Sequence, residues 1–194
     1  MRHSGGIVTS RRNGYRLHVK DDGGDYERIW DDLRQGRIPG LITLKHTHRR
    51  EVYLAEVKGR QLIIKIDHQV PKRFEVKLWH LLRGPMRSRI MRLVNRAVAV
   101  GCNVTADIYL VAERLEKGIC REACIIQEYL PGRTLLSIHA ESGDVGVDAY
   151  REQLAAAMRE LHGHKLVLSD LGYNNVLVTP AGIKLIDLSW NGPF

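Results

Sequence analysis

Two carboxylates and one amide near the end of the sequence have the residue types and spacing used in phosphoryl transfer. Asn175 follows Asp170 by five positions, and Asp187 comes after an apolar hairpin pattern. Carboxylate and amide oxygens are suitable ligands for Mg²⁺, and a carboxylate beside a hydroxyl can accept its proton or orient it. The pattern predicts Asp170 as the catalytic base, with Asn175 and Asp187 as ligands of Mg²⁺ bound with ATP. The alternative is that all three stabilise turns.

A lysine inside an apolar strand is the candidate contact for the nucleotide phosphates. Lys65 lies within the sequence LIIKI at residues 62–66, where a buried charge is costly unless it is paired. Kinases pair such a lysine with a helix glutamate. Glu75 is the predicted partner, because it is the only acidic residue between Asp67 and Asp107. The alternatives are an edge-strand lysine that points to water and a carboxylate favoured by a helix N-terminus.

Two further segments are candidates for nucleotide contacts. Residues 127–132 end an apolar strand, and there we expect the main chain of Glu128 and Leu130 to bind the adenine edge; a plain strand end is the alternative. Residues 46–50 lie where kinases place a glycine-rich loop over the phosphates, but this turn contains no glycine. Its arginine and threonine side chains are candidates for phosphate contacts. An exposed basic hairpin is the alternative.

These residues need a sheet, a helix and a second hairpin to position them. Hydrophobic periodicity and turn residues predict the elements. We expect helices over 25–35 and 147–161, and a helical region over 71–103 that is broken near Gly84 and Pro85. We expect strands over 40–45, 51–57, 60–66, 106–111 and 123–129, a strand or arm over 16–20, and a hairpin of 176–178 with 183–186. This order predicts an α+β, protein-kinase-like bilobal fold. Residues 1–130 would form an N-lobe with a five-stranded antiparallel sheet, and residues 131–194 a partial helical C-lobe.

The composition indicates a basic globular chain with an anionic partner. The 194 residues are 44% hydrophobic and 27% charged, which is ordinary for a globular protein. The sequence has no apolar run of about 18 residues that would span a bilayer, and residues 1–13 lack the apolar core of a secretory signal. The three cysteines are expected to be reduced thiols of a cytosolic protein.

The net charge is +8, with lysine and arginine crowded between Lys72 and Arg96. A surface of this kind suits an anionic partner. Nucleic acid, anionic lipid headgroups and a phosphorylated glycan all fit the charge, and a solvated helix face is the alternative.

Motifs spread over the sequence resemble those of the bacterial lipopolysaccharide core heptose(II) kinase family. The resemblance runs from about Asn13 to Ser189 and is most specific at residues 109–114, YLVAER. It also rests on NGY at 13–15, RFE at 73–75, LLRG at 81–84, EYLPG at 128–132 and IDLS at 186–189.

The resemblance implies ATP-dependent phosphorylation of a heptose hydroxyl in the lipopolysaccharide inner core. It further implies a cytoplasmic protein in peripheral contact with the inner face of the anionic inner membrane, and no nucleic-acid partner. The acceptor glycolipid and the membrane are both anionic, which agrees with the basic charge.

The sequence departs from the kinase pattern around the predicted base and at its end. Leu168 and Ser169 stand where His and Arg precede the base in an H-R-D motif, so control by activation-loop phosphorylation is not expected. Residues 171–174 are LGYN, where the family usually carries His and Gly. The sequence stops at Phe194, where the family continues with a basic helical tail. Two rival functions are another small-molecule or protein kinase of this fold and a pseudokinase-like binding module with a basic surface.

Overall fold

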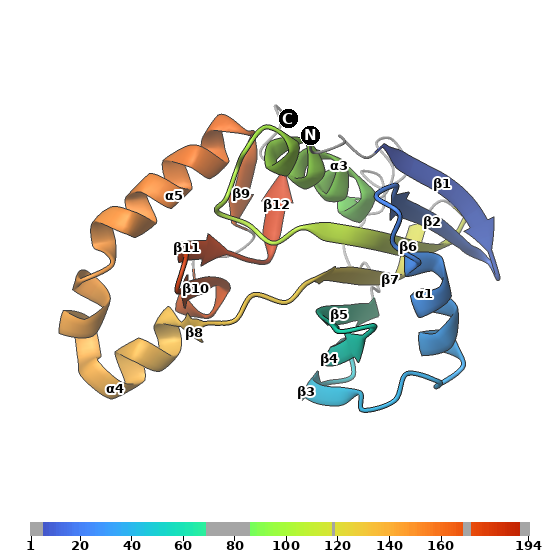
Figure 1. Ribbon diagram of the computed structural model, residues 1–194, viewed down its shortest axis with the longest axis horizontal. Coiled ribbons are helices and arrows are strands. Elements are labelled where there is room, and N and C mark those ends of the chain that lie inside the picture. Colours follow the sequence, from blue (N-terminus) through green and yellow to red (C-terminus); the bar gives the residue numbers. More distant parts are fainter. Residues whose placement is uncertain (1–5, 69–85, 118, 169–171, 191–194) are drawn as a thin grey trace. The chain divides into compact units, whose positions relative to one another are not determined.

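The computed structural model describes residues 6–68, 86–117, 119–168 and 172–190 (Figure 1). Two of the predicted site residues, Glu75 and Asp170, lie outside the described residues. The chain divides into two compact units, Met1–Met91 with Ile108–Tyr129, and Arg92–Asp107 with Leu130–Phe194. The two lobes expected from the sequence stay a prediction.

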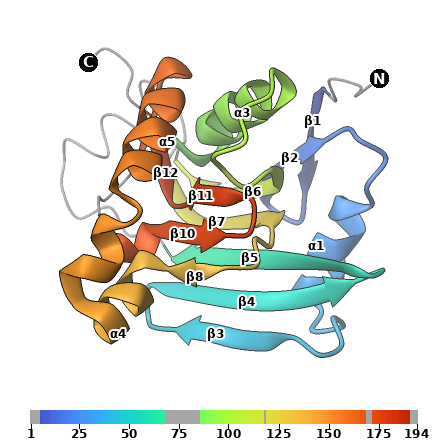
Figure 2. The same cartoon turned by 60° about the vertical axis from the view of Figure 1, so that its left-hand side comes forward.

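The first unit is built on an antiparallel sheet of seven strands in the order β1-β2-β6-β7-β5-β4-β3 (Figures 1 and 2). The strands are β1 (Ile7–Arg12), β2 (Tyr15–Lys20), β3 (Ile42–His46), β4 (Arg50–Val57), β5 (Arg60–His68), β6 (Ile108–Glu116) and β7 (Ile119–Glu128). The predicted five-stranded sheet is corrected here. Strands β1 and β2 form a hairpin through Asn13 and Gly14, and β2 pairs with β6, which extends the sheet by two strands.

The hydrophobic core of this unit lies between one face of the sheet and α1 (Tyr26–Arg34). Tyr26 and Trp30 are buried at helical spacing, and Gly36 follows the helix with a left-handed φ of 65°. The expected helix over 25–35 is therefore confirmed. Along β5, Leu62, Ile64 and Ile66 belong to this core. Because side chains alternate along a strand, Lys65 faces the opposite side of the sheet.

Replacing Trp30 with Ala is expected to lower the free energy of unfolding by about 3–5 kcal/mol, since a large buried ring leaves a cavity. Trp30 is 1% exposed, and its ring centroid lies 5.0 Å from that of Tyr15 in an edge-to-face arrangement. Urea unfolding measures the loss. Leu44→Ala on exposed β3 is the control and should change stability little. Equal effects of the two substitutions would contradict the assigned core.

The second unit combines helices with two small antiparallel sheets, β11-β10-β8 and β12-β9. Its elements are α4 (Leu135–Asp148), α5 (Arg151–Gly163), the 3₁₀ turn η1 (Tyr173–Asn175), and strands β8 (Arg133–Thr134), β9 (Leu166–Leu168), β10 (Val176–Thr179), β11 (Gly182–Leu185) and β12 (Leu188–Trp190). Helix α3 (Met86–Ala99) is divided between the units after Met91. The β10–β11 hairpin confirms the predicted one.

The helix predicted over 147–161 begins later than expected, and another helix precedes it that the sequence analysis missed. The observed α5 starts at Arg151, and α4 precedes it. Thr134 caps α4, because its Oγ1 accepts the Ser137 N–H at 3.1 Å. Gly143, with a φ of 61°, interrupts the helical backbone of α4. The segment has no continuous apolar stripe, so periodicity gave little indication of a helix.

Two expectations about the chain as a whole can be compared with the described residues. Within them, no helix combines the length and apolar character needed to cross a bilayer. Cys102, Cys120 and Cys124 are free and buried. Burial raises the pKa of all three thiols, that of Cys120 to about 12. These side chains therefore pack as neutral apolar groups.

Candidate functional site

The β10–β11 hairpin brings the predicted magnesium ligands Asn175 and Asp187 to neighbouring positions. Val176 pairs with Leu185, and the Ile186 N–H donates to the Asn175 carbonyl at 2.9 Å. Ile186 therefore continues the ladder opposite Asn175, and Asp187 is the next residue. Asn175 is 4% exposed and Asp187 is half-buried. One amide and one carboxylate are therefore located at the same end of one hairpin.

Asp187 has an unusual backbone conformation at the point where the chain changes sheets. Its φ is 57°, in the left-handed region, which costs less for Asp than for most residues with a β-carbon. Leu185 ends a strand of one small sheet and Leu188 begins a strand of the other. Such strain concentrates at functional sites. The left-handed residue turns the chain between the two sheets and thereby fixes where the Asp187 main chain lies.

Strand β9 directly precedes the segment that contains Asp170. Leu168 ends β9 and is directly paired with Leu188, the first residue of β12 and the neighbour of Asp187. Asp170 follows Leu168 by two positions in the sequence but lies outside the described residues. The chain therefore enters the Asp170 segment from a residue paired with the neighbour of Asp187.

Buried contacts within the second unit hold this hairpin in place. Leu185 is fully buried, its N–H donates to the Val104 carbonyl at 2.7 Å, and it forms a parallel bridge with Thr105. The Lys184 ammonium donates to the Asn103 carbonyl. The segment after α3 and strand β11 thus support each other, which gives Asn175 and Asp187 a rigid base.

In the first unit, Lys65 lies on an interior strand. It pairs with Val52 of β4 on one side and Ile125 of β7 on the other, and it is half-buried. The alternative of an edge-strand lysine is therefore excluded. Since Lys65 faces away from the α1 core, its ammonium group belongs to the opposite face of the sheet.

Two buried carboxylates on this same face anchor the beginning of α3, and the sequence analysis missed both. Asp67 is 7% exposed and accepts from Arg50 Nε and Arg87 Nη2, each at 2.6 Å. Glu113 is fully buried and accepts the Ser88 N–H at 3.2 Å. An acidic residue inside an apolar strand was the available signal in each case, because a buried charge needs partners. The two carboxylates hold the first turns of α3 against the face that carries Lys65.

The β3–β4 turn is closed by a side chain instead of by glycines. The Thr47 Oγ1 accepts the N–H of Arg49 at 3.4 Å and that of Arg50 at 3.0 Å. These main-chain donors are thus already used within the turn. The Arg50 guanidinium is bound to Asp67, whereas no acidic side chain among the described residues pairs with exposed Arg49. The exposed Arg49 guanidinium is a permanent positive charge that this turn can offer to an anion.

The segment predicted to bind adenine lies where the chain passes from one unit to the other. Strand β7 ends at Glu128, and the Tyr129 N–H donates to the Gln61 carbonyl at 3.3 Å. Leu130 is the first residue of the second unit. The main-chain groups of Glu128 and Leu130 therefore flank a residue that is tied to β5.

The donor set at the hairpin suits Mg²⁺ better than a metal held by protein alone. Among the described residues, no group of three or more His, Cys, Asp or Glu side chains is arranged to hold a metal ion. Asn175 and Asp187 offer one amide and one carboxylate. Mg²⁺ in phosphoryl-transfer sites takes one or two carboxylates and completes its shell with water and phosphate oxygens. The residues present therefore fit an ion that arrives with a nucleotide.

Comparisons with known proteins agree with one another. A family model described as lipopolysaccharide core biosynthesis protein (WaaY) matches residues 6–193. The lipopolysaccharide core heptose(II) kinase WaaY of Escherichia coli is 23% identical over 185 residues, which cover 94% of this chain and 77% of that protein. The protein of the same name from Escherichia coli (strain K12) is 24% identical over 183 residues, with coverages of 94% and 77%.

Proposed function

The chain belongs to the lipopolysaccharide core biosynthesis protein (WaaY) family, and on that premise we propose that it transfers phosphate from ATP to a heptose hydroxyl in the inner core of lipopolysaccharide. The match over residues 6–193, with relatives named heptose(II) kinases, carries this conclusion. The enzyme is a phosphotransferase with an alcohol group as acceptor.

The proposed roles follow the chemistry of each side chain. Asp170 is the base, and Asn175 and Asp187 hold Mg²⁺, which screens the negative charge of the phosphates when it is bound. Lys65, paired with Glu75, contacts the phosphates. The main chain of Glu128 and Leu130 binds adenine. The interior position of Lys65 and the proximity of Asn175 to Asp187 in one hairpin support these assignments.

The proposed reaction is a displacement at the γ-phosphorus. The heptose oxygen forms a bond to this phosphorus, the bond to the oxygen bridging to the β-phosphate breaks, and ADP leaves. Asp170 accepts the proton of the attacking hydroxyl. Because the transition state is loose, catalysis depends mostly on positioning and on charge stabilisation. A rigid hairpin for Asn175 and Asp187 suits that demand.

The proposed architecture is a kinase-like bilobal fold, with which an α+β chain containing an antiparallel sheet and four helices among its described residues is compatible. We place the enzyme in the cytoplasm, in peripheral contact with the inner membrane. The acceptor is a glycolipid, and a net charge of +8 favours attraction to an anionic membrane surface.

Phosphate transfer by the purified full chain tests the proposal. Dephosphorylated inner-core lipopolysaccharide and casein are offered in parallel with Mg-ATP, and mass spectrometry locates any new phosphate. We expect phosphate on a heptose and none on casein. Transfer to casein alone would favour a protein kinase of the same fold. No transfer, together with no thermal stabilisation by Mg-ATP, would favour a binding module.

Replacing Arg49 with Ala is expected to raise the KM for ATP about two- to fivefold, the effect of losing one solvent-exposed charge contact worth up to about 1 kcal/mol. Steady-state kinetics measures the change. Stability should stay the same, because Arg49 is exposed. Arg50→Ala is the comparison and should lower stability, since Asp67 loses a partner at 2.6 Å. An unchanged KM in Arg49→Ala would identify the turn as an exposed basic hairpin.

A further inference from the structure

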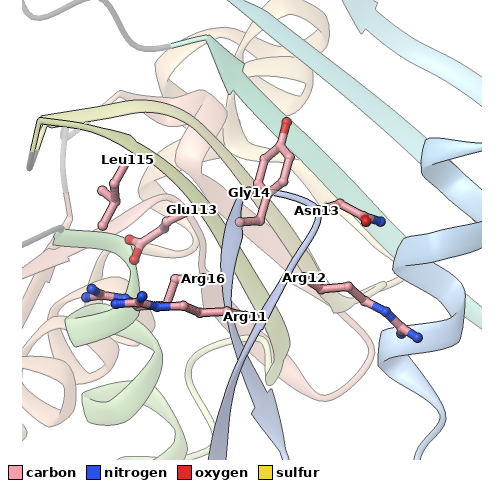
Figure 3. A pocket seen from close by; sticks show the side chains of 8 residues that line it. Arg11, Arg12, Asn13, Gly14, Arg16, Glu113 and Leu115 are labelled. Carbon is pink, nitrogen blue, oxygen red and sulfur yellow. The ribbon is translucent and has the colours of Figure 1, made fainter.

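A second candidate site lies at the β1–β2 hairpin, within the first unit alone. A cavity of about 520 Å³ opens there, and Figure 3 shows side chains that line it. Its lining comes from the hairpin and from β6, and consists of Arg11, Arg12, Asn13, Gly14, Tyr15, Arg16, Glu113 and Leu115. The sequence analysis assigned no role to these arginines.

Two of the arginines are directly opposite each other in the sheet. Arg11 of β1 pairs with Arg16 of β2, so both side chains leave the same face. Directly opposed residues on an antiparallel pair have their β-carbons about 4.5–5.5 Å apart, and like charges at that distance destabilise the pair. In Figure 3, Arg11 and Arg16 extend to the same side, whereas Arg12 points away toward α1. The hairpin therefore concentrates two positive charges at one edge of the cavity.

No acidic side chain in the described part of the chain forms an ion pair with Arg11 or Arg16. The neighbouring Arg12 differs, because its Nη1 lies 2.6 Å from Asp31 Oδ2. Arg11 is exposed and Arg16 is half-buried. Two guanidinium groups are thus held together by strand pairing while the nearest arginine is neutralised. Such a pair is stabilised by an anion placed between its members.

The carboxylate of Glu113 lines the same cavity and must be included in the charge. In the register of β2 and β6, the main chain of Glu113 lies opposite that of Arg16. Its Oε1 accepts the Ser88 N–H, and its Oε2 lies 3.8 Å from His18 Nε2. Those contacts are directed into the protein interior. The sum over Arg11, Arg16 and Glu113 is one positive charge, so the site still attracts an anion.

We propose that Arg11 and Arg16 form a binding site for a phosphate monoester. Guanidinium groups present planar pairs of N–H donors that match phosphate oxygens. Two guanidinium groups carry two positive charges, so they suit a phosphate dianion better than they suit a carboxylate with its single charge. Within the first unit, the site is separate from Lys65, which belongs to the proposed nucleotide site. Three strand spacings separate β2 from β5, which places the main chain of Lys65 about 14 Å from that of β2. It therefore stands or falls independently of the proposed phosphotransfer.

Glucose 6-phosphate, inorganic phosphate and vesicles containing phosphatidic acid carry the same monoester or phosphate chemistry in three forms. Calorimetry with the full chain measures the first two, and vesicle flotation measures the third. Binding of the soluble sugar phosphate identifies a saccharide source, and binding of vesicles alone identifies a headgroup source. Arg11→Gln should weaken binding of whichever form is bound by about tenfold or more, the effect of one charge-assisted hydrogen bond. Arg12→Gln is the matched control and should bind as the wild type does.

A purely structural role for the pair makes the opposite prediction about stability. Without ligand, Arg11→Gln should melt at the same temperature as the wild type or higher, because a like-charge contact is removed. The KM for ATP should stay within twofold of the wild-type value. Failure of the wild type to bind any of the three probes would overturn the proposal. So would equal losses in Arg11→Gln and Arg12→Gln, or competition of ATP with the sugar phosphate for one site.

Discussion

Asp187→Asn is expected to reduce the kcat for phosphate transfer by about a thousandfold, as does the loss of a group that stabilises transition-state charge. Asn has the same shape as Asp and also tolerates the left-handed φ of 57° found at this position. The substitution therefore removes the charge and leaves the turn between β11 and β12 in place. Single-turnover kinetics with saturating Mg-ATP measures the chemical step directly.

Two comparisons separate the chemical role of Asp187 from a structural one. Asp144→Asn changes an exposed carboxylate that interacts with His139 at 3.1 Å, and it should keep full activity. The free energy of unfolding of Asp187→Asn should lie within about 1 kcal/mol of the wild-type value, which is the usual range for a change without cavity or cap loss. If Asp187→Asn kept more than a tenth of the wild-type kcat, Asp187 would be a turn residue and no metal ligand.

Lys65→Met is expected to lower kcat/KM for ATP by about 100- to 1000-fold, because a preorganised positive charge on the phosphates is lost. Met keeps most of the aliphatic length of Lys, so the packing against Val52 and Ile125 on the neighbouring strands is retained. Initial rates at varied ATP concentration measure the change.

Lys45→Met on the exposed edge strand β3 is the matched control. It removes one positive charge from the same sheet, and its kinetics should equal those of the wild type. Stability gives a second criterion, because Lys65→Met leaves Glu75 without its proposed partner and should lower the free energy of unfolding, whereas Lys45→Met should not. Equal kinetics for the two variants would show that Lys65 has no contact with the nucleotide.

Much of the fold followed from local signals in the sequence. The Lys58-Gly59 turn supplies the two positive φ values that a tight hairpin needs, and alternation defined β4 and β5 on either side of it. Strand β1 was missed because its residues are mostly exposed and carry no apolar alternation. Strand β1 forms because β2 offers an edge with which it can pair. Pairing of this kind depends on the tertiary structure and leaves no local pattern in the sequence, and α4 likewise has no local pattern that predicts it.

The candidate site divides in the same way. The spacing of Asn175 and Asp187 around a hairpin was sufficient to predict that they lie near each other, since the ladder fixes the register. Asp67 and Glu113 each gave a signal, as acidic residues in apolar strands, but a single sequence does not show that their partners lie at the beginning of α3. The roles of Glu75 and Asp170 stay predictions, as both lie outside the described residues.

The most direct test of the central claim is mass spectrometry of the lipopolysaccharide core from a strain whose chromosomal copy of this gene is deleted. The strain is complemented with either the wild-type gene or an Asp170→Asn variant, with equal protein levels verified by immunoblotting. We predict that the wild-type gene adds phosphate to one heptose of the inner core and that Asp170→Asn does not. A core with the same phosphate content in both strains would contradict the assignment of Asp170 as the base. A wild-type gene that leaves the core unchanged would contradict the proposed function itself.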